Sequence, residues 1–356
     1  MRLAILNDTH LGIRNSSDIF IQYQDDFYTK VFFPYLIEND IKHIVHLGDA
    51  LEHRRFVNYK ALNAHRFHFL DKLRDHGITM DIVPGNHDVY YKNTLQLCAL
   101  KELFGHYMNE ITIHMDPTVL EFDGFKLGMV PWICQENQSD VFDFLENCKA
   151  DMIGGHFELS GFEVMRGMVL PGHGQDGVLE RLKRFETVVS GHYHTKSNQG
   201  NIHYLGSQME FFWNDCDDPK FFHVFDTETR ELTPVRNDIT LYEKIYYDDT
   251  KHDYNAMDLD HLDRKFVKVI VINKTDAFTF ERLLDRIQNQ KIHELKIQEN
   301  LNEFIGENVA DSGLEIEDTG QLLAGYVDNV ETILDKDRLK AELMDLMTEA
   351  ETFEIS

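Results

Sequence analysis

Five short polar motifs carry the residues of this chain whose types could do chemistry. In chain order they are Asp8-Thr9-His10, Gly48-Asp49, Gly85-Asn86-His87-Asp88, Gly155-His156 and Gly191-His192-Tyr193-His194. Their side chains offer oxygen and imidazole nitrogen donors and no thiolate, a set that suits Mn²⁺, Fe²⁺ or Zn²⁺ better than Ca²⁺. Glycines precede four of the donors and allow the tight backbone turns that a crowded site needs. The motifs therefore predict a metal site.

The number of donors is the number that a pair of metal ions requires. Two ions about 3.5–4 Å apart need around seven protein ligands, one of them a bridging carboxylate. The motifs supply seven, namely Asp8, His10, Asp49, Asn86, His156, His192 and His194. Taken singly, an Asp-x-His is common, a Gly-Asp is usually just a turn, and histidine pairs occur by chance. The ordered set of five motifs is far more specific, and it indicates a dinuclear site.

Each motif begins where an apolar run ends, so the elements that must position the donors are strands. Leu3–Leu6, Ile41–Leu47 and Met80–Val83 are three such runs. Between them, Asp25–Asn39 and Tyr59–His76 carry apolar residues at three- and four-residue spacing, which predicts helices. Strands that alternate with helices indicate a layered α/β fold. In such folds the carboxyl ends of the strands collect ligand-binding residues, so five distant segments can meet in one cleft.

Beyond residue 110 the predicted elements are shorter and more strand-like, which suggests a second sheet stacked on the first. The expected strands are Ile111–Ile113, Val119–Phe122, Lys126–Val130, Met152–Gly154, Val188–Ser190, His203–Leu205, Phe221–Phe225 and Leu232–Val235. The polar stretch Asp248–Asp263 is interpreted as a linker or mobile surface segment. A strand at Phe266–Ile272, a helix at Phe278–Gln288 and a strand at Ile292–Ile297 then predict a small α/β capping domain.

The chain of 356 residues is long for one core, and its composition divides it further. The expected domains are the α/β core that carries the metal motifs at 1–235, the capping domain at 236–300, an acidic linker at 301–320 and a helical tail at 321–356. Two amphipathic patterns, Gln321–Leu334 and Arg338–Thr352, predict the helices of the tail. The predicted fold class is thus a two-sheet α/β sandwich with a small α/β cap and a C-terminal helical tail.

The net charge of −27 argues against a chain that grips nucleic acid by itself, because phosphate binding usually leaves a basic footprint. Residues 299–356 hold 16 acidic and 3 basic residues, which accounts for about half of the excess. Metal-ligating carboxylates account for part of the remainder, since bound cations offset them. If DNA is the substrate, we expect a partner to supply much of the binding.

Cysteine usage and hydropathy predict a soluble protein that is not secreted. The four cysteines, Cys98, Cys134, Cys148 and Cys216, form no CxxC pair and are interpreted as reduced, packed thiols. No charged-then-apolar leader precedes Leu11, and no apolar run approaches the roughly 18 residues that span a bilayer. We therefore expect a cytoplasmic location and no membrane partner.

The series DTH…GD…GNHD…GGH…GHYH resembles the calcineurin-like metallophosphoesterases. Residues 1 to about 235 are more narrowly similar to the SbcD-type recombination nucleases, and in particular to the nuclease subunits of T4-like bacteriophages. The runs that carry this likeness are VPGNHDVYYKN, LGMVPWICQEN, GGHFELSGF, VVSGHYHT and FHVFDTET. The cap and the tail match that family by layout rather than by specific motifs.

The resemblance implies how the seven donors divide between two ions. One ion would be held by Asp8, His10, Asp49 and His194, and the other by Asp49, Asn86, His156 and His192, with Asp49 as the bridge. His87 resembles the catalytic histidine beside the scissile phosphate, and Asp88 would orient its ring. The family often has a second histidine or an acidic residue just after the Gly-Asp turn. Glu52 and His53 compete for that position here, and His53 is kept as a further catalytic candidate.

The activity that the resemblance implies is a Mn²⁺-dependent nuclease, with 3′-to-5′ exonuclease activity on duplex DNA and endonuclease activity on single strands. It would act in DNA recombination and repair, and in the bacterial host cytoplasm if the chain is phage-encoded. One alternative is a phosphatase or small-molecule phosphodiesterase that uses the same dinuclear site. Another is a largely non-catalytic scaffold that recruits DNA and an ATPase.

Two protein partners follow from the same resemblance. The tail would dock on the coiled-coil root of an SbcC-type ABC ATPase, and the alternative is that it folds back on its own domain. The segments Tyr59–Leu73 and Thr94–Phe104 resemble the helices through which this family forms homodimers, and the alternative is packing within the monomer.

Basic residues near the metal-bearing loops are candidate phosphate contacts, among them Arg14, Arg54, Arg55, Lys60, Arg66 and Lys92.

Overall fold

The computed structural model describes residues 1–169, 175 and 177–299, together with Val327, Lys336 and Leu339. The chain divides into two compact units after Asp311, and the first of them contains all the sheets of the described residues. The linker expected at 301–320 and the helices expected at 321–334 and 338–352 lie outside the described residues, apart from Val327 and Leu339.

The first sheet has four parallel strands, and two antiparallel strands extend one edge. Its order is β14 (Leu232–Asn237), β13 (Lys220–Asp226), β1 (Arg2–Leu6), β2 (His43–His46), β3 (Thr79–Ile82) and β4 (Ile111–Ile113). Sequence patterns placed the strands at 111–113, 221–225 and 232–235 with the second sheet. They belong to the first sheet instead, because β13 returns to pair with β1 and β4 pairs with β3.

The second sheet repeats this design with four parallel strands and an antiparallel strand at each edge. Its order is β11 (Ser197–Gln199), β12 (Ile202–Tyr204), β10 (Thr187–Ser190), β7 (Met152–Gly155), β6 (Phe125–Val130) and β5 (Thr118–Phe122). A short hairpin of β8 (Glu163–Met165) and β9 (Met168–Val169) follows β7 in the chain. The predicted stacked pair of sheets is confirmed.

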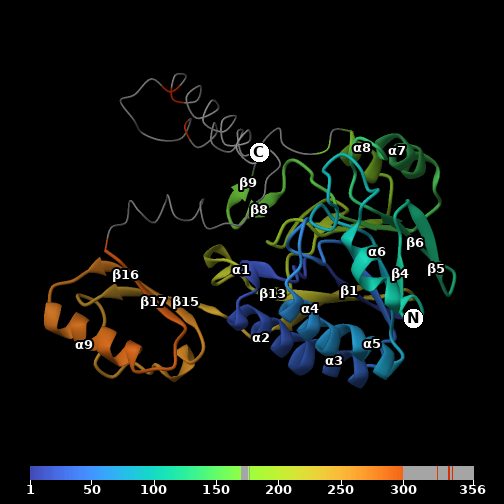
Figure 1. Ribbon diagram of the computed structural model, residues 1–356. Coiled ribbons are helices and arrows are strands. Elements are labelled where there is room, and N and C mark those ends of the chain that lie inside the picture. The colour runs from blue at the N-terminus through green and yellow to red at the C-terminus, as the bar shows by residue number, and fades with distance from the viewer. Residues whose placement is uncertain (170–174, 176, 300–326, 328–335, 337–338, 340–356) are drawn as a thin grey trace, which may run out of the picture. The chain divides into compact units, whose positions relative to one another are not determined.

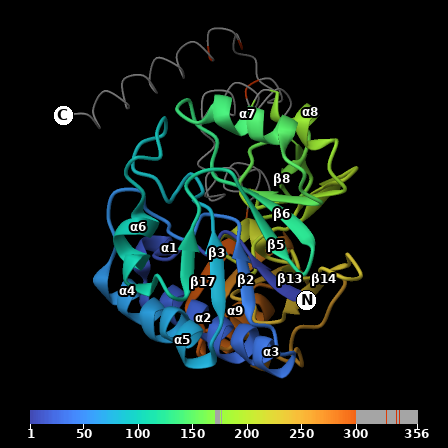
Figure 2. The same cartoon turned by 90° about the vertical axis from the view of Figure 1, so that its right-hand side faces the viewer.

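Helices cover the outer faces of both sheets, which gives four layers (Figures 1 and 2). The helices beside the first sheet are α2 (Asp18–Phe27), α3 (Phe33–Glu38), α4 (Tyr59–His65), α5 (Asp71–His76) and α6 (Ala99–Phe104). Those beside the second sheet are α7 (Gln138–Asn147) and α8 (Val178–Leu182). π-Helical turns at Tyr28–Phe32 and Arg66–Leu70 join α2 to α3 and α4 to α5, so each predicted long helix is interrupted once.

Side chains that point alternately to the two faces of each strand divide the apolar core into two clusters. In β1, Ala4 and Leu6 face the helices, whereas Leu3 and Ile5 face the second sheet and meet Leu127 and Met129 of β6 in one cluster. Successive side chains of a strand point to opposite faces, so a strand that is buried on both faces is apolar throughout. This explains why the run Leu3–Leu6 shows no polar alternation.

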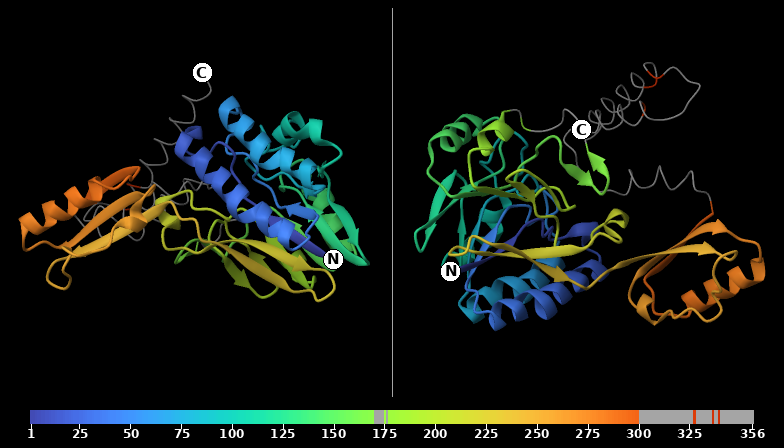
Figure 3. Two further views of the ribbon diagram at one scale, coloured as in Figure 1. Left: turned by 90° about the horizontal axis from the view of Figure 1, so that it is seen from below. Right: turned by 180° about the vertical axis from the view of Figure 1, so that it is seen from behind.

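The capping domain is a three-stranded parallel sheet with one helix. Its strands are β15 (Tyr242–Asp248), β16 (Phe266–Asn273) and β17 (Glu294–Gln298), and Figure 3 shows α9 (Ala277–Gln288) along one face of them. β16, α9 and β17 match the predicted strand, helix and strand, whereas β15 was not predicted. Val267, Val269 and Leu283 belong to a separate apolar core.

The stretch Asp248–Asp263 is packed rather than a linker or mobile surface segment. Tyr254, Leu259 and Leu262 are buried in the core of the cap. The Arg286 guanidinium of α9 donates to the backbone carbonyls of Tyr254, Asn255 and Met257. The polar composition misled the prediction because three apolar side chains are enough to anchor the stretch in the core of the cap. Within the described part of the chain, no helix combines the length and the apolar character needed to cross a membrane.

Asp81 on β3 forms ion pairs with histidines on β2 and just after β4. We expect these contacts to make the free energy of unfolding depend on pH in the acid range. Its carboxylate lies 2.7 Å from Nε2 of His43 on β2 and 2.5 Å from Nε2 of His114 after β4. Burial raises the pKa of Asp81, but hydrogen bonds from the two histidines outweigh it and lower that pKa to about 2. A lowered carboxyl pKa stabilises the fold above the unfolded pKa, and the contribution disappears as the pH falls toward 2.

We therefore expect Asp81→Asn to lower the free energy of unfolding by about 2 kcal/mol at pH 6, with a difference that shrinks between pH 4 and pH 2. Urea unfolding at a series of pH values measures it. Asp123→Asn is the control, because that side chain is 78% exposed. A constant difference between the two proteins down to pH 2 would contradict the assignment.

Candidate metal centre

The seven predicted ligands follow five parallel strands. Three of these strands belong to the first sheet and two to the second. Asp8 and His10 follow β1, Asp49 follows β2, Asn86 follows β3, His156 follows β7, and His192 and His194 follow β10. The carboxyl ends of parallel strands meet at one edge of a sheet. Because the two sheets are stacked with these edges together, loops from both contribute to one cluster.

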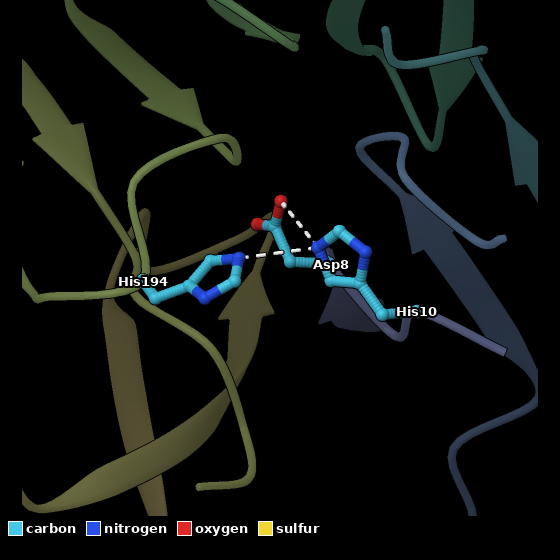
Figure 4. A group of neighbouring side chains, drawn as sticks. All are labelled: Asp8, His10 and His194. Atoms are coloured by element: carbon cyan, nitrogen blue, oxygen red, sulfur yellow. Dashed lines mark hydrogen bonds and ion pairs between the residues drawn. The ribbon is translucent and has the colours of Figure 1, made fainter. Parts of the chain in front are cut away.

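Asp8, His10 and His194 form the first group (Figure 4), with ligand atoms all within 4.8 Å of one another. The Nε2 atoms of His10 and His194 face each other at 3.1 Å, and Nε2 of His10 is 3.9 Å from Oδ1 of Asp8. Figure 4 shows the two rings reaching toward Asp8 from opposite sides. His194 is more than 180 positions away from Asp8 and His10 in the sequence, and the stacking of the two sheets brings it to them.

Asp49, His156 and His192 form the second group. Nε2 of His156 lies 3.2 Å from Oδ2 of Asp49. The side-chain oxygen of Asn86 lies 3.1 Å from Nε2 of His156 and 3.2 Å from Nδ1 of His192. All four residues that the family resemblance predicts for this side of the centre therefore converge.

Asp49 is common to both groups. The same Oδ2 that approaches His156 lies 4.0 Å from Nε2 of His10 and 4.0 Å from Nε2 of His87. His10, Asp49 and His87 accordingly form a third overlapping group of potential metal ligands. A single carboxylate thus faces donors from both sheets.

Four of the predicted ligands have a left-handed backbone, although none of them is glycine. Their φ angles are 47° at Asp8, 44° at His10, 55° at Asp49 and 85° at His192. Such a conformation costs a non-glycine residue about 1–2 kcal/mol, and it clusters at functional sites. Strain is therefore concentrated where the donors converge.

The buried carboxylates of the cluster attract positive charge, which is seen in the shifted pKa values of their neighbours. Burial lowers the pKa of His10, but the Glu52 carboxylate raises it to about 9. Burial likewise lowers the pKa of His156, and Asp49 raises it to about 9. Burial raises the pKa of Asp49, yet His156 and His87 hold it well below its usual range. Bound metal ions would compensate the same negative charge, so the residues present fit a metal site.

Comparison with known proteins places the chain in a family, although no family model matches it. The chain is 30% identical over 340 residues to exonuclease subunit 1 of Enterobacteria phage T4, and the match covers 95% of both proteins. The chain belongs to the family of that exonuclease subunit. This is the SbcD-type branch that the motif series resembles.

Two solved structures are similar at a much lower level. A novel archaeal phosphodiesterase is 14% identical, with a TM-score of 0.35 over 67% of this chain and 100% of that one. A glutamine-dependent NAD⁺ synthetase from Acinetobacter baumannii is 12% identical, with a TM-score of 0.30 over 98% of this chain and 72% of that one. At these scores the likeness identifies no activity.

His87, which the sequence resemblance predicts to be the catalytic histidine, is oriented by a main-chain carbonyl. Its Nδ1 donates to the carbonyl oxygen of Glu52 at 2.6 Å, which directs Nε2 toward Asp49. Asp88 was expected to orient this ring, and that expectation is wrong. The Asp88 carboxylate accepts instead from the backbone amides of Gly85, Ala50 and Leu51, and so fixes the two loops that carry Asp49 and His87.

His53 is not among the groups of potential metal ligands in the described part of the chain. Its ring stacks on Phe56 with centroids 4.2 Å apart. Glu52 reaches the cluster instead, because its Oε2 lies 2.9 Å from Nδ1 of His10. The sequence left the two residues in competition, and the direction of the chain after Asp49 favours the glutamate.

Sequence reasoning missed two charged residues that support the ligands. Glu158 is buried, and its Oε1 lies 3.7 Å from Nε2 of His192. A carboxylate two residues after His156 was the available signal. The Lys220 ammonium is also buried and donates to the carbonyl oxygen of His194 at 3.0 Å and to Asp215 at 2.6 Å. A lysine that opens a strand gives no such signal, because it usually lies in solvent.

Aromatic side chains enclose the ligand histidines. The Trp132 ring lies 6.0 Å from that of His156 and 5.6 Å from that of His192. The Phe211 ring lies 5.6 Å from that of His10 and 5.5 Å from that of His194. Both aromatic side chains are buried. They limit the movement of the imidazoles and lower the local dielectric, which strengthens the electrostatics of the site.

Gly85 allows the close approach on which Asp49 depends. A Cβ at this position would lie 2.1 Å from Oδ1 and 2.5 Å from the backbone nitrogen of Asp49. We expect Gly85→Ala to displace Asp49 and to weaken Mn²⁺ binding about 10–100-fold, as loss of other supporting contacts does. Isothermal titration calorimetry measures the affinity.

Gly105→Ala is the matched control, because a Cβ there meets nothing within 4 Å and φ is −58°. Unchanged Mn²⁺ affinity in Gly85→Ala would show that Asp49 does not need its observed position to bind metal.

Proposed function

We propose that this chain is the nuclease subunit of an ATPase–nuclease complex and hydrolyses the phosphodiester bonds of DNA at a pair of divalent cations, with Mn²⁺ preferred. The observation that carries the proposal is the convergence of Asp8, Asp49, Asn86 and the histidines from five loops in a chain of the exonuclease subunit 1 family. The expected activities are 3′-to-5′ exonuclease on duplex DNA and endonuclease on single strands, used in recombination and repair.

Each cation has its own set of ligands in this proposal. Asp8, His10 and His194 would hold one ion, Asn86, His156 and His192 would hold the other, and Asp49 would be available to both. The short distances within each group and the position of Asp49 between them support this division. Bound divalent cations lower the pKa of coordinated water and neutralise charge on a phosphoryl group.

His87 supplies the chemistry of the protein itself. With Nδ1 donating to a carbonyl, the protonated His87 ring also carries a proton on Nε2, which it can donate as a hydrogen bond to a phosphoryl oxygen or transfer to the leaving 3′ oxygen. The side chain is 10% exposed, whereas that of His156 is completely buried, so His87 is the more accessible to a substrate. Trp132 and Phe211 help to exclude water from the back of the cluster.

The acidic charge of the chain supports a division of labour. A net charge of −27 repels DNA, so a partner must supply much of the phosphate contact. We propose an SbcC-type coiled-coil ABC ATPase, bound through residues 321–356, for this role. The proposed domains are the nuclease core at 1–235, the cap at 236–300, the acidic linker at 301–320 and the ATPase-binding tail at 321–356.

Replacing His87 should separate metal binding from chemistry. We expect His87→Ala to lower kcat on labelled DNA about 10²–10⁴-fold, the usual contribution of a general acid, while both Mn²⁺ ions remain bound. The assay uses duplex DNA, single-stranded DNA and bis-p-nitrophenyl phosphate, each with Mn²⁺ or EDTA and with or without the ATPase.

Cleavage that persists in EDTA and survives His87→Ala would refute this mechanism. Turnover of the small ester with no preference for DNA would favour the alternative of a small-molecule phosphodiesterase. Asp49→Ala that leaves the function of the complex intact would favour a scaffold.

Exposed aromatic residues support the proposed homodimer. Tyr59 is 84% exposed and Phe67 50% exposed on the α4–α5 segment, and Leu97 is 39% exposed just before α6. Because large apolar side chains in solvent mark contact surfaces, we expect Phe67→Asp to convert a dimer to a monomer. Analytical ultracentrifugation measures the mass, and Phe278→Asp on α9, where Phe278 is 72% exposed, is the control. A monomeric parent protein would contradict the homodimer.

A further inference from the structure

Glu52 touches two histidines of the centre through two different parts of the residue. Its side-chain Oε2 lies 2.9 Å from Nδ1 of His10. Its main-chain carbonyl oxygen accepts from Nδ1 of His87 at 2.6 Å. The rings of His10 and His87 lie edge to face, with centroids 5.0 Å apart. Glu52 therefore contacts both a proposed metal ligand and the histidine proposed to act on the substrate.

The backbone of this segment is held independently of the Glu52 side chain. The amide of Glu52 donates to the carbonyl oxygen of Leu11 at 3.0 Å, and Leu11 and Leu51 form a parallel bridge. The amide of Leu51 donates to the Asp88 carboxylate at 3.0 Å. The loop is thus tied to the segments that follow β1 and β3. Its carbonyl direction is set by these main-chain contacts, whereas the carboxylate depends on the side chain alone.

A carboxylate at Nδ1 determines what the other ring nitrogen of His10 can do. It favours the tautomer with the proton on Nδ1 and leaves the lone pair on Nε2, the atom that faces His194 and Asp8. Histidines that bind metal ions commonly have a carboxylate or carbonyl at the distal nitrogen, and loss of that partner weakens metal binding about 10–100-fold. For His156 the partner is the carbonyl oxygen of Leu47, at 2.9 Å from Nδ1. For His10 the group in that place is the Glu52 carboxylate, whose Oε2 makes an ion-pair contact with Nδ1 rather than a hydrogen bond of standard geometry.

We propose that Glu52 is a positioning residue with two separable roles. Its side chain turns His10 toward one metal ion, and its main-chain carbonyl turns His87 toward the substrate. The proposal rests on the proposed dinuclear nuclease function and assigns to Glu52 the position that His53 could also have filled. His53 stacks on Phe56, which directs its ring away from both roles.

If the two roles are separable, substitution of the Glu52 side chain should weaken metal binding and leave the orientation of His87 unchanged. Glu52→Gln keeps the size of the side chain and removes its charge, and it leaves the carbonyl in place. We expect one of the two Mn²⁺ sites to lose affinity about 10–100-fold, whereas kcat at saturating Mn²⁺ stays close to that of the parent protein. Glu52→Asp withdraws the carboxylate from Nδ1 and should have the same effect.

The experiment measures metal binding and catalysis separately on the full-length protein. Calorimetric titration with Mn²⁺ gives the number and affinity of the sites, and electron paramagnetic resonance reports the spin coupling of a Mn²⁺ pair. Nuclease rates on labelled DNA are then measured across a series of Mn²⁺ concentrations. Melting temperatures without metal show that each variant is folded, and Glu52→Asp carries the same expectation should Glu52→Gln fail to fold.

Three other variants serve for comparison. Glu121→Gln removes an exposed carboxylate on β5 and should leave both affinities unchanged. His87→Ala should give the opposite pattern, with two tight Mn²⁺ sites and a low kcat. His53→Ala should alter neither quantity, and a loss of metal affinity in His53→Ala but not in Glu52→Gln would overturn the proposal.

The outcome distinguishes this inference from the function on which it rests. If the parent protein binds two Mn²⁺ ions and cleaves DNA, and Glu52→Gln gives the same isotherm, then only the role of Glu52 fails. If the parent protein binds no pair of ions or does not cleave DNA, the proposed function itself fails. A weakened site with a preserved kcat at saturation supports both.

Discussion

One buried aspartate imposes the conditions that the rest of the centre has to meet. Asp49 is 2% exposed, and burial of a carboxylate costs several kcal/mol unless positive charge and hydrogen bonds compensate. The backbone amide of His87 donates to its Oδ1 at 2.9 Å, while imidazoles from both sheets surround its Oδ2. These imidazoles only partly balance the charge. A site built around Asp49 is therefore most stable with cations in it, which links the stability of the fold to the proposed chemistry.

Main-chain contacts between the loops of the first sheet stabilise this arrangement. Left-handed backbone at Asp8, His10 and Asp49 costs energy, and short main-chain bonds between neighbouring loops offset it. The amide of Asp8 donates to the carbonyl of Gly48 at 3.0 Å, and that of His10 donates to the carbonyl of Asp49 at 3.1 Å. A Cβ at Gly48 would lie 2.7 Å from the backbone nitrogen of Gly85, so this contact needs the two glycines. The loops are thus fixed to one another before any side chain binds a ligand.

Catalysis and substrate binding make opposite electrostatic demands, and the chain meets the first of them. Carboxylates such as Asp49, Glu52 and Glu158 attract cations, but they also repel a phosphate backbone. The surface offers little compensation, since the described arginines are partly used inside the fold. The Arg14 guanidinium, for example, donates to the carbonyl of Phe211 and lies 4.8 Å above the ring of Phe212. This conflict is the physical reason for proposing that a second protein binds the DNA.

The sequence by itself determined the donors, the strands that precede them and the α/β class, because these follow from residue types and local periodicity. It could also give the helix and two of the strands of the cap. Local patterns could not assign β4, β13 and β14 to the first sheet, find β15, or reveal that Asp248–Asp263 is packed, since pairing and burial depend on distant segments. The same limit applies to the site. The tertiary fold decides whether Glu52 or His53 reaches His10, and which atom orients His87. It also decides that Lys220 contacts His194, because the partners of a side chain depend on which separate loops meet.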